Sequence, residues 1–328
     1  MSRAFNQQIN TLNQEMVQIY RNDNAYISYT SAALPQRSAV IEILREIRKL
    51  FYPRHYGDRQ LFNCTIGYYI GNLMMSIEER LHHQVRLALL RANDTKEDAE
   101  KEDPAVLDER ASKISCEFMN RLPKVRQMLT MDVQAAYDGD PAASDLDEIV
   151  LTYPGIFTMM VYRLAHELYV MHVPILPRMM TEYAHSRTGI DINPGAVIGK
   201  YFFMDHGTGI VIGETTEIGD YVKLYQGVTL GALSTRGGQR LHGKKRHPTI
   251  GDRVTIYSNA SVLGGKTVIG HDTIIGGNCF ITEPIPACSR VFIKNPDLTI
   301  EKDSGPRTGT EIPNPDAEPE LVEDKNKQ

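Results

Sequence analysis

Residues 210–231 read IVIGETTEIGDYVKLYQGVTLG, and an aliphatic residue recurs in this stretch at every sixth position. The recurring residues are Ile212, Ile218, Leu224 and Leu230. A period of 3.6 residues would indicate an α-helix and a period of two an ordinary β-strand, so this pattern fits neither. Hexapeptide periodicity is typical of a parallel β-helix, in which three short faces complete one coil. Glycine often follows the aliphatic residue, and we expect it to supply a corner conformation that a Cβ atom would oppose.

The same period continues on both sides of this stretch, between residues 190 and 281. Upstream it is offset by two residues, and downstream it resumes after an interruption. These further positions are Ile192, Ile198, Met204, Ile250, Ile256, Val262, Ile269, Ile275 and Ile281. Coils of this kind bury their apolar residues by stacking on one another. The sequence therefore predicts a parallel β-helix over residues 189–300.

The segments on either side of the predicted β-helix have different patterns. Residues 1–188 carry apolar residues at helical spacing, most clearly Val40, Ile43, Leu44, Ile47, Leu50 and Phe51, with Ser38 before them and Pro53 after them. Residues 301–328 contain eight acidic and four basic residues and few apolar ones. The prediction is an α+β chain with a helical domain at 1–188, a β-helix domain at 189–300 and a disordered tail at 301–328.

Composition excludes several classes of protein. A chain of 328 residues is long enough for two domains, and its net charge of −5 gives no reason to expect a nucleic acid partner. The most apolar helical stretch, 155–173, contains Arg163, His166 and Glu167, so we expect it not to span a membrane. The N-terminus is too polar for a signal peptide, and the four cysteines are scattered. Reduced thiols and a cytoplasmic protein are expected.

The six-residue repeat is interrupted twice, and interruptions are where a solenoid places functional residues. The step that ends at Ile212 is eight residues long, with a two-residue excess around DHGTG at 205–209. The second interruption, ALSTRGGQRLHGKKRHP at 232–248, is rich in glycine and basic residues. It is too polar for a core face, so we expect an exposed loop. Its end returns Arg246 and His247 to the coil.

At this point the residues resemble a known family. Residues 189–234, GIDINPGAVIGKYFFMDHGTGIVIGETTEIGDYVKLYQGVTLGALS, followed by RHPTIGD at 246–252, are similar to serine O-acetyltransferase of the hexapeptide-repeat acyltransferase superfamily. The resemblance covers roughly residues 140–281. It implies a left-handed β-helix and acetyl transfer from acetyl-CoA to the hydroxyl of L-serine. The product would be O-acetyl-L-serine, made in the first committed step of cysteine biosynthesis. It implies acetyl-CoA as a co-substrate, with no permanently bound cofactor and no metal.

The chemistry of such a transfer independently requires a general base. A serine hydroxyl is a weak nucleophile near neutral pH, and histidine titrates in the range needed to take its proton. His206 is the candidate base. A base histidine needs an acceptor on its other ring nitrogen, and the resemblance assigns Asp191 to this orienting role. The alternative is that Asp191 is only a corner residue that leads into a turn.

Serine as an acceptor is a zwitterion, so its site needs a cation for the carboxylate and an anion for the ammonium group. We expect Arg246 and His247 to provide the first, and Asp205 and Asp140 the second. The assignment of Asp140 rests on the resemblance, because members of the family carry an acid in a D-P-A motif about fifty residues before the I-D motif. Without that resemblance Asp140 could equally be a helix cap. A second D-P-A, at 103–105, is interpreted as a decoy.

The resemblance also implies how the chain assembles. Members form a homotrimer or a dimer of trimers, with sites between subunits. Gly231 and Ala232 match the small residues beside the thioester, and Ser258 matches a position that meets the pantetheine arm. Many members end in an isoleucine that binds a sulfhydrylase in the cysteine synthase complex. This chain ends in Gln328, so we expect no such complex through the C-terminus.

Three alternatives remain open at this stage. A sugar or antibiotic acyltransferase would keep the base histidine but would need no Arg-His pair. A γ-type carbonic anhydrase would need three closely placed zinc ligands, and His206, His242, His247 and His271 lack that spacing. A non-catalytic scaffold would have no reason for the expanded Asp-His corner. Glu214 is interpreted as a solvated acid in a turn.

Overall fold

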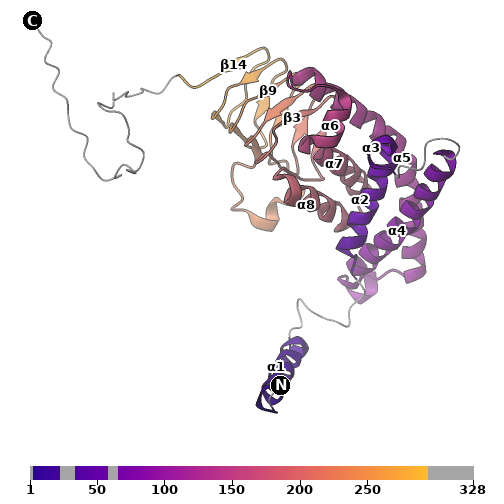
Figure 1. The fold of residues 1–328 in the computed structure, drawn as a ribbon. Coiled ribbons are helices and arrows are strands. Elements are labelled where there is room, and N and C mark those ends of the chain that lie inside the picture. Colours follow the sequence, from indigo (N-terminus) through magenta and orange to yellow (C-terminus); the bar gives the residue numbers. More distant parts are fainter. Residues whose placement is uncertain (1–2, 23–33, 58–65, 295–328) are drawn as a thin grey trace, which may run out of the picture. The chain divides into compact units, whose positions relative to one another are not determined.

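The computed structural model describes residues 3–22, 34–57 and 66–294 (Figure 1). Its helices are α1 (Arg3–Asn22), α2 (Arg37–Phe51), α3 (Pro53–Tyr56), α4 (Ile66–Asp94), η1 (Asp98–Glu100), α5 (Pro104–Gly139), α6 (Leu146–Thr152), α7 (Pro154–Val170), α8 (Leu176–Thr188) and η2 (Gly238–Leu241). Its strands are β1 (Asp191–Ile192), β2 (Val197–Ile198), β3 (Phe203–Asp205), β4 (Val211–Ile212), β5 (Glu217–Ile218), β6 (Lys223–Tyr225), β7 (Thr229–Gly231), β8 (Thr249–Ile250), β9 (Thr255–Ile256), β10 (Ser261–Leu263), β11 (Val268–Ile269), β12 (Ile274–Ile275), β13 (Phe280–Ile281) and β14 (Arg290–Val291). The tail predicted for 301–328 lies outside the described residues.

The helices follow the apolar stripes of the sequence. In α2 the buried residues are Val40, Ile43, Leu44, Ile47 and Phe51, so the predicted stripe is confirmed. The helix begins at Arg37 rather than after the expected cap Ser38, and it stops before Pro53, whose ring cannot continue it. In α5 the carboxylate of Asp103 accepts a hydrogen bond from the backbone of Ala105 at 2.7 Å. The second D-P-A motif is therefore a helix cap.

The strands stack into three parallel sheets that form the faces of a β-solenoid of about five turns (Figure 1). The first sheet has the order β1-β4-β7-β10-β13, the second β2-β5-β8-β11 and the third β3-β6-β9-β12-β14. Register aligns the aliphatic positions of successive coils, as in the column Ile192, Ile212, Leu230, Val262 and Ile281. All five are buried. The predicted parallel β-helix is thus confirmed, including the resumption of the period after residue 248.

The glycines after the aliphatic positions have a different role from the one expected. Gly199, Gly219, Gly251 and Gly270 do not have positive φ values, and the left-handed corners are held by non-glycine residues such as Tyr221. A Cβ atom built on Gly199 would come within 2.5 Å of the Gly219 carbonyl oxygen, and one on Gly251 within 2.8 Å of backbone in the next coil. The glycines are therefore needed because stacked coils approach closely, and the expected corner conformation was wrong for them.

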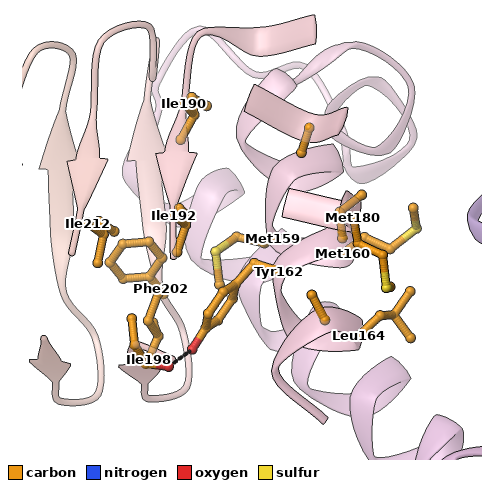
Figure 2. Close-up of a cluster of buried hydrophobic side chains, with 14 of the residues drawn as sticks. Met159, Met160, Tyr162, Leu164, Met180, Ile190, Ile192, Ile198, Phe202 and Ile212 are labelled. Atoms are coloured by element: carbon orange, nitrogen blue, oxygen red, sulfur yellow. Dashed lines mark hydrogen bonds between the residues drawn. The ribbon is translucent and has the colours of Figure 1, made fainter. Parts of the chain in front are cut away.

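The helices and the β-helix share one hydrophobic core. Figure 2 shows Met159 and Tyr162 of α7 directed toward Ile198 and Phe202 of the first coil. Tyr162 is buried, and its hydroxyl donates a hydrogen bond to the carbonyl oxygen of Ala196 at 2.6 Å. Burying a large apolar side chain contributes roughly 1.5–3 kcal/mol, so this contact fixes the first coil against α7.

A buried ion pair joins α7 and the first coil to a third part of the molecule, α5. Arg163 of α7 donates to both carboxylate oxygens of Asp132 in α5, at 2.7 and 2.8 Å, and also to the carbonyl oxygen of Gly199 at 2.8 Å. The backbone N–H of Phe202 donates to Asp132 at 3.1 Å. Removing one partner of such a pair typically costs about 3–5 kcal/mol, because the other charge is left buried. None of the described helices is long and apolar enough to cross a membrane.

The boundary between helices and coil lies close to the predicted position. Helix α8 ends at Thr188 and β1 begins at Asp191. The excursion at 232–248 leaves the first sheet after β7 and returns to the second sheet at β8, and most of its side chains are exposed as expected. The division into domains at residues 188 and 300 remains a proposal.

Candidate active site

His206 stands at the expanded corner between the third and first sheets. It follows β3 directly, and the two extra residues of the coil place Gly207 and Gly209 at φ 87° and 81° before β4 begins. The His206 side chain is 70% exposed. Its own φ of 59° is left-handed, but other corner residues such as Tyr201 share this conformation, so it is a property of the coil. The imidazole therefore projects from the corner at which the coil is two residues longer than its neighbour.

Acidic and basic groups surround this imidazole. Nδ1 of His206 lies 3.6 Å from Asp205, whose side chain is only 14% exposed. The ammonium group of Lys223 lies 3.7 Å from the other oxygen of Asp205 and donates a hydrogen bond at 2.6 Å to the carbonyl oxygen of Gly139. Gly139 ends α5 and immediately precedes Asp140. Lys223 thus ties the end of a helix to the corner that carries His206.

Asp140 belongs to the same group of charges. Its carboxylate accepts hydrogen bonds from the Tyr153 hydroxyl at 2.6 Å and from the backbone of Ala142 at 2.9 Å. These two bonds, in that order, hold the pKa of Asp140 below its usual value, and the charges of Lys223 and His206 act in the same direction. Burial and the bond to Asp140 raise the pKa of Tyr153 to about 12. Asp140 is therefore an ionised carboxylate that faces the His206 corner.

Asp191 occupies the first position of β1 and lies beside the same corner. Its side chain is an ion-pair partner of Arg178 at 3.7 Å. Among the described residues, no hydrogen bond joins Asp191 to His206. The chain segment of Asp191 nevertheless approaches the corner, because a Cβ atom on Gly207 would come within 2.6 Å of the Ile190 side chain. In a single chain the carboxylate nearest to His206 is that of Asp205.

Arg246 and His247 lie at a different corner, between the first and second sheets. His247 is 7% exposed, and its Nδ1 accepts a hydrogen bond from the backbone N–H of Thr215 at 3.0 Å. The ring occupies space left by Gly213, since a Cβ atom there would lie 2.1 Å from the imidazole. Burial, followed by the charge of Arg246, lowers the pKa of His247 to about 4. His247 is therefore neutral at pH 7, with the proton on Nε2 as a hydrogen-bond donor.

Glu214 holds the arginine of this second corner. Its carboxylate is the ion-pair partner of Arg246 and accepts a hydrogen bond from the Tyr169 hydroxyl at 3.2 Å. Burial acts to raise the pKa of Glu214, but Arg246 and Tyr169 outweigh it and the pKa lies below its usual value. The interpretation of Glu214 as a solvated acid was wrong. A hydrogen bond from the backbone of Arg246 to the Thr215 hydroxyl, at 2.9 Å, completes the corner.

The predicted thioester and pantetheine positions divide between the same two corners. Gly231 ends β7 and Ala232 opens the excursion, so both lie at the corner of Arg246. Ser258 lies at the corner of His206, two coils further on, and its carbonyl oxygen accepts a hydrogen bond from the next coil at 2.9 Å. The predicted site residues of one chain are therefore divided between two separate corners.

Two clusters of potential metal ligands lie elsewhere in the described part of the chain. The ligand atoms of Glu182, His185 and Asp191 lie within 4.8 Å of one another, as do those of His271, Asp272 and Cys288. Each cluster contains a single histidine. Asp191 is the only predicted site residue in either of these two clusters.

A coil of hexapeptide repeats with a projecting Asp-His corner defines the class of hexapeptide-repeat transferases. The chain belongs to the serine acetyltransferase family within this class. It is 46% identical over 259 residues to the plasmid serine acetyltransferase of Synechococcus elongatus. The aligned residues cover 78% of this chain and 81% of that protein. It is 47% identical over 169 residues to the serine acetyltransferase of Mycobacterium tuberculosis, covering 52% of this chain and 70% of the relative.

A solved structure supports the same assignment. The chain resembles serine acetyltransferase isoform 3 of Entamoeba histolytica in complex with cysteine, with a TM-score of 0.67 and 35% identity over 88% of this chain and 93% of that one. No protein-family model matches the chain. Sequence and structure therefore agree on the family, and the resemblance inferred from the motifs is confirmed.

The sequence identified most residues of both corners but missed the ones that hold them. Lys223, Tyr153 and Thr215 gave no signal in the chain. Lys223 binds a residue 84 positions away in sequence, and Thr215 contacts residues 31 and 32 positions away. Only Glu214 gave an indication of these contacts, because it lies in the I-G-E-T motif, close to the interruption of the six-residue repeat.

Proposed function

We propose that the protein transfers the acetyl group of acetyl-CoA to the hydroxyl of L-serine, which releases CoA and forms O-acetyl-L-serine. The observation that carries this proposal is the exposed imidazole of His206 at an acid-lined corner, in a chain of the serine acetyltransferase family. The product makes this the first committed step of cysteine biosynthesis. The reaction needs acetyl-CoA as a co-substrate and no permanently bound cofactor.

His206 is the proposed general base. Its Nδ1 faces Asp205, which leaves Nε2 to take the proton of the serine hydroxyl while the oxygen attacks the thioester carbonyl. As the carbon–sulfur bond breaks, the same proton passes from His206 to the thiolate of CoA. Asp191 remains the proposed orienting acid, since its backbone neighbour Ile190 packs beside the residue that follows His206. Asp205 competes for this role because it is the nearer carboxylate in the single chain.

The two corners supply opposite charges for the amino acid. Asp140 and Asp205 are carboxylates beside His206 and suit the ammonium group of serine. The serine carboxylate is proposed to bind the guanidinium of Arg246 and the Nε2–H group of His247. Because His247 is neutral, it donates a hydrogen bond without adding a charge. A sugar acceptor has no carboxylate and would not need the pair of Arg246 and His247.

We propose that neighbouring copies of the chain complete the site. His206 and Arg246 lie at different corners of one β-helix. A single chain therefore presents the two halves of the proposed site on different sides. A threefold arrangement brings the His206 corner of each copy against the Arg246 corner of the next, and closed rings of this kind use one repeated interface. Acetyl-CoA would then lie between copies, with Gly231 and Ala232 on one wall and Ser258 on the other. Pairing of two such trimers is compatible with this arrangement.

A cytoplasmic location is also proposed. Within the described part of the chain Cys116, Cys279 and Cys288 are free thiols, which suits a reducing compartment. Neither a nucleic acid nor a membrane is needed for the reaction.

A complementation experiment tests both the chemistry and the shared site. His206→Ala and Arg246→Ala should each be inactive in a thiol-release assay with acetyl-CoA and L-serine. If equal amounts of the two proteins are mixed, denatured and refolded together, the mixture should regain about one quarter of the wild-type sites. About three quarters of the rings are then mixed, and one of the three interfaces in each mixed ring pairs two intact corners. Homoserine and an aminosugar serve as alternative acceptors in the same assay.

The outcomes separate the parts of the proposal. Activity with an aminosugar but not with L-serine would overturn the acceptor. Full inactivity of the refolded mixture, with active wild type refolded in parallel, would mean that each chain holds its own complete site.

A further inference from the structure

A cavity of about 300 Å³ lies between α2, α7 and α8, and none of its lining residues belongs to the proposed catalytic or substrate-binding set. Three arginines line it, and no acidic residue does. These are Arg45 and Arg48 from α2 and Arg187 from α8. A volume of this size is at the lower end of the range of small-molecule sites.

The positive charge of this cavity is largely uncompensated. Arg45 pairs with Glu42 at 3.1 Å, in a largely exposed contact. Arg48 donates to the Tyr56 hydroxyl, and its guanidinium lies 3.6 Å from the centre of that ring. In the described part of the chain neither Arg48 nor Arg187 has a carboxylate partner. Two of the three cations therefore have no carboxylate partner among the described residues, and the exposed pair of Arg45 with Glu42 is weak enough for an anion to compete with it.

The other walls suit the same kind of ligand. Helix α7 begins at Pro154 in the wall of the cavity, and no side chain caps its first turn. The positive end of a helix dipole favours an anion at this point. Tyr153, Phe157 and Tyr183 contribute aromatic rings to its walls. Arginine forks match the geometry of phosphate and carboxylate oxygens.

We propose that this cavity binds a small multivalent oxyanion, of the kind found in phosphate esters and polycarboxylates. The three guanidinium groups bind its oxygens, and the aromatic walls limit its size.

The cavity is connected to the His206 corner by two contacts. The ring of Tyr153 lines the cavity while its hydroxyl donates to Asp140. Thr188, also a lining residue, accepts a hydrogen bond from the backbone of Ile190 at 3.2 Å, and Ile190 packs against the chain beside His206. An occupied cavity therefore acts on the affinity for serine. This coupling rests on the proposed function, whereas binding of the anion does not.

Titration calorimetry on the full chain tests the binding, with inorganic pyrophosphate and citrate as separate probes. Wild type should bind one probe molecule per chain, and Arg45→Gln and Arg187→Gln should each weaken binding about tenfold. Both side chains are exposed at the rim, so the fold should be retained. Arg54→Gln is the matched control, because Arg54 is an exposed arginine on neighbouring α3 that pairs with Asp147. Stronger binding of pyrophosphate assigns a phosphate ester, and stronger binding of citrate a polycarboxylate.

The binding proposal is wrong if neither probe binds saturably, or if both rim variants bind as wild type does. The coupling is tested by the KM for L-serine, which should change at saturating probe in wild type and change less in Tyr153→Phe, where only the contact through Thr188 remains. A constant KM with a bound probe would overturn the coupling. Loss of all transfer activity with normal probe binding would instead contradict the proposed function.

Discussion

Two histidines stand at two corners of one β-helix, and their surroundings are opposite. The side chain of His206 is 70% exposed and projects from an expanded corner in which two glycines with positive φ, Gly207 and Gly209, follow it. His247 is 7% exposed, fits against Gly213 and has its Nδ1 occupied by the backbone of Thr215. The difference shows that the fold, more than the residue type, decides the chemistry of an imidazole. An exposed ring beside an acid can exchange its proton, whereas a buried neutral ring is a fixed hydrogen-bond donor.

The largest effect is expected at the exposed histidine. His206→Ala should lower kcat by roughly 10²–10⁴, because removing a general base has an effect of this size. Steady-state rates with L-serine and acetyl-CoA provide the measurement, with the oligomeric state followed by size-exclusion chromatography. His271→Ala is the control, since it removes another exposed histidine from a later coil. A His206→Ala enzyme with wild-type kcat would exclude this residue as the base.

The contrast between the corners was only partly visible in the sequence. The six-residue period predicted that Ile212 stacks on Leu230, and its interruption predicted where the insertion at His206 lies. Both could be predicted because a repeat and its interruption involve residues that are close in sequence. Partners that are distant in sequence leave no such signal. The bonds of Lys223 to Gly139 and of Tyr153 to Asp140 depend on how the helices dock on the coil.

Two further differences have physical reasons. The glycines after the aliphatic positions were expected at left-handed corners, but sequence cannot distinguish a need for positive φ from a need for close approach. Arg163 was used only as an argument against a membrane span. Its partner Asp132 lies 31 residues away, and that pairing makes a charged residue in an apolar helix part of the core.

The buried histidine should make the stability of the fold depend on pH. The pKa of His247 is lowered from 6.5 to about 4 in the folded chain, so as the pH falls the unfolded chain binds the proton first. Its contribution is fully present above pH 6.5 and is lost as the pH falls toward 4. Between pH 7 and pH 5 the free energy of unfolding should fall by about 2 kcal/mol per chain from this group. Urea unfolding of wild type and of His247→Gln at pH 7 and pH 5 measures this effect. The free energy of unfolding should fall more steeply with decreasing pH in wild type than in the variant. Equal slopes would mean that the ring is not held neutral.

The smallest effect is expected at Lys223, which supports the exposed corner without touching the reacting atoms. Lys223→Met removes the ammonium group, which lies 4.8 Å from the ring centres of Phe203 and Tyr225, and with it the hydrogen bond to Gly139 and the contact with Asp205. Because one such bond is worth about 0.5–1.5 kcal/mol, the KM for L-serine should rise about two- to tenfold while the KM for acetyl-CoA stays constant. Lys200→Met, an exposed lysine in the first coil, is the control. A lower thermal stability with both KM values unchanged would show that Lys223 stabilises the fold and does not position Asp140.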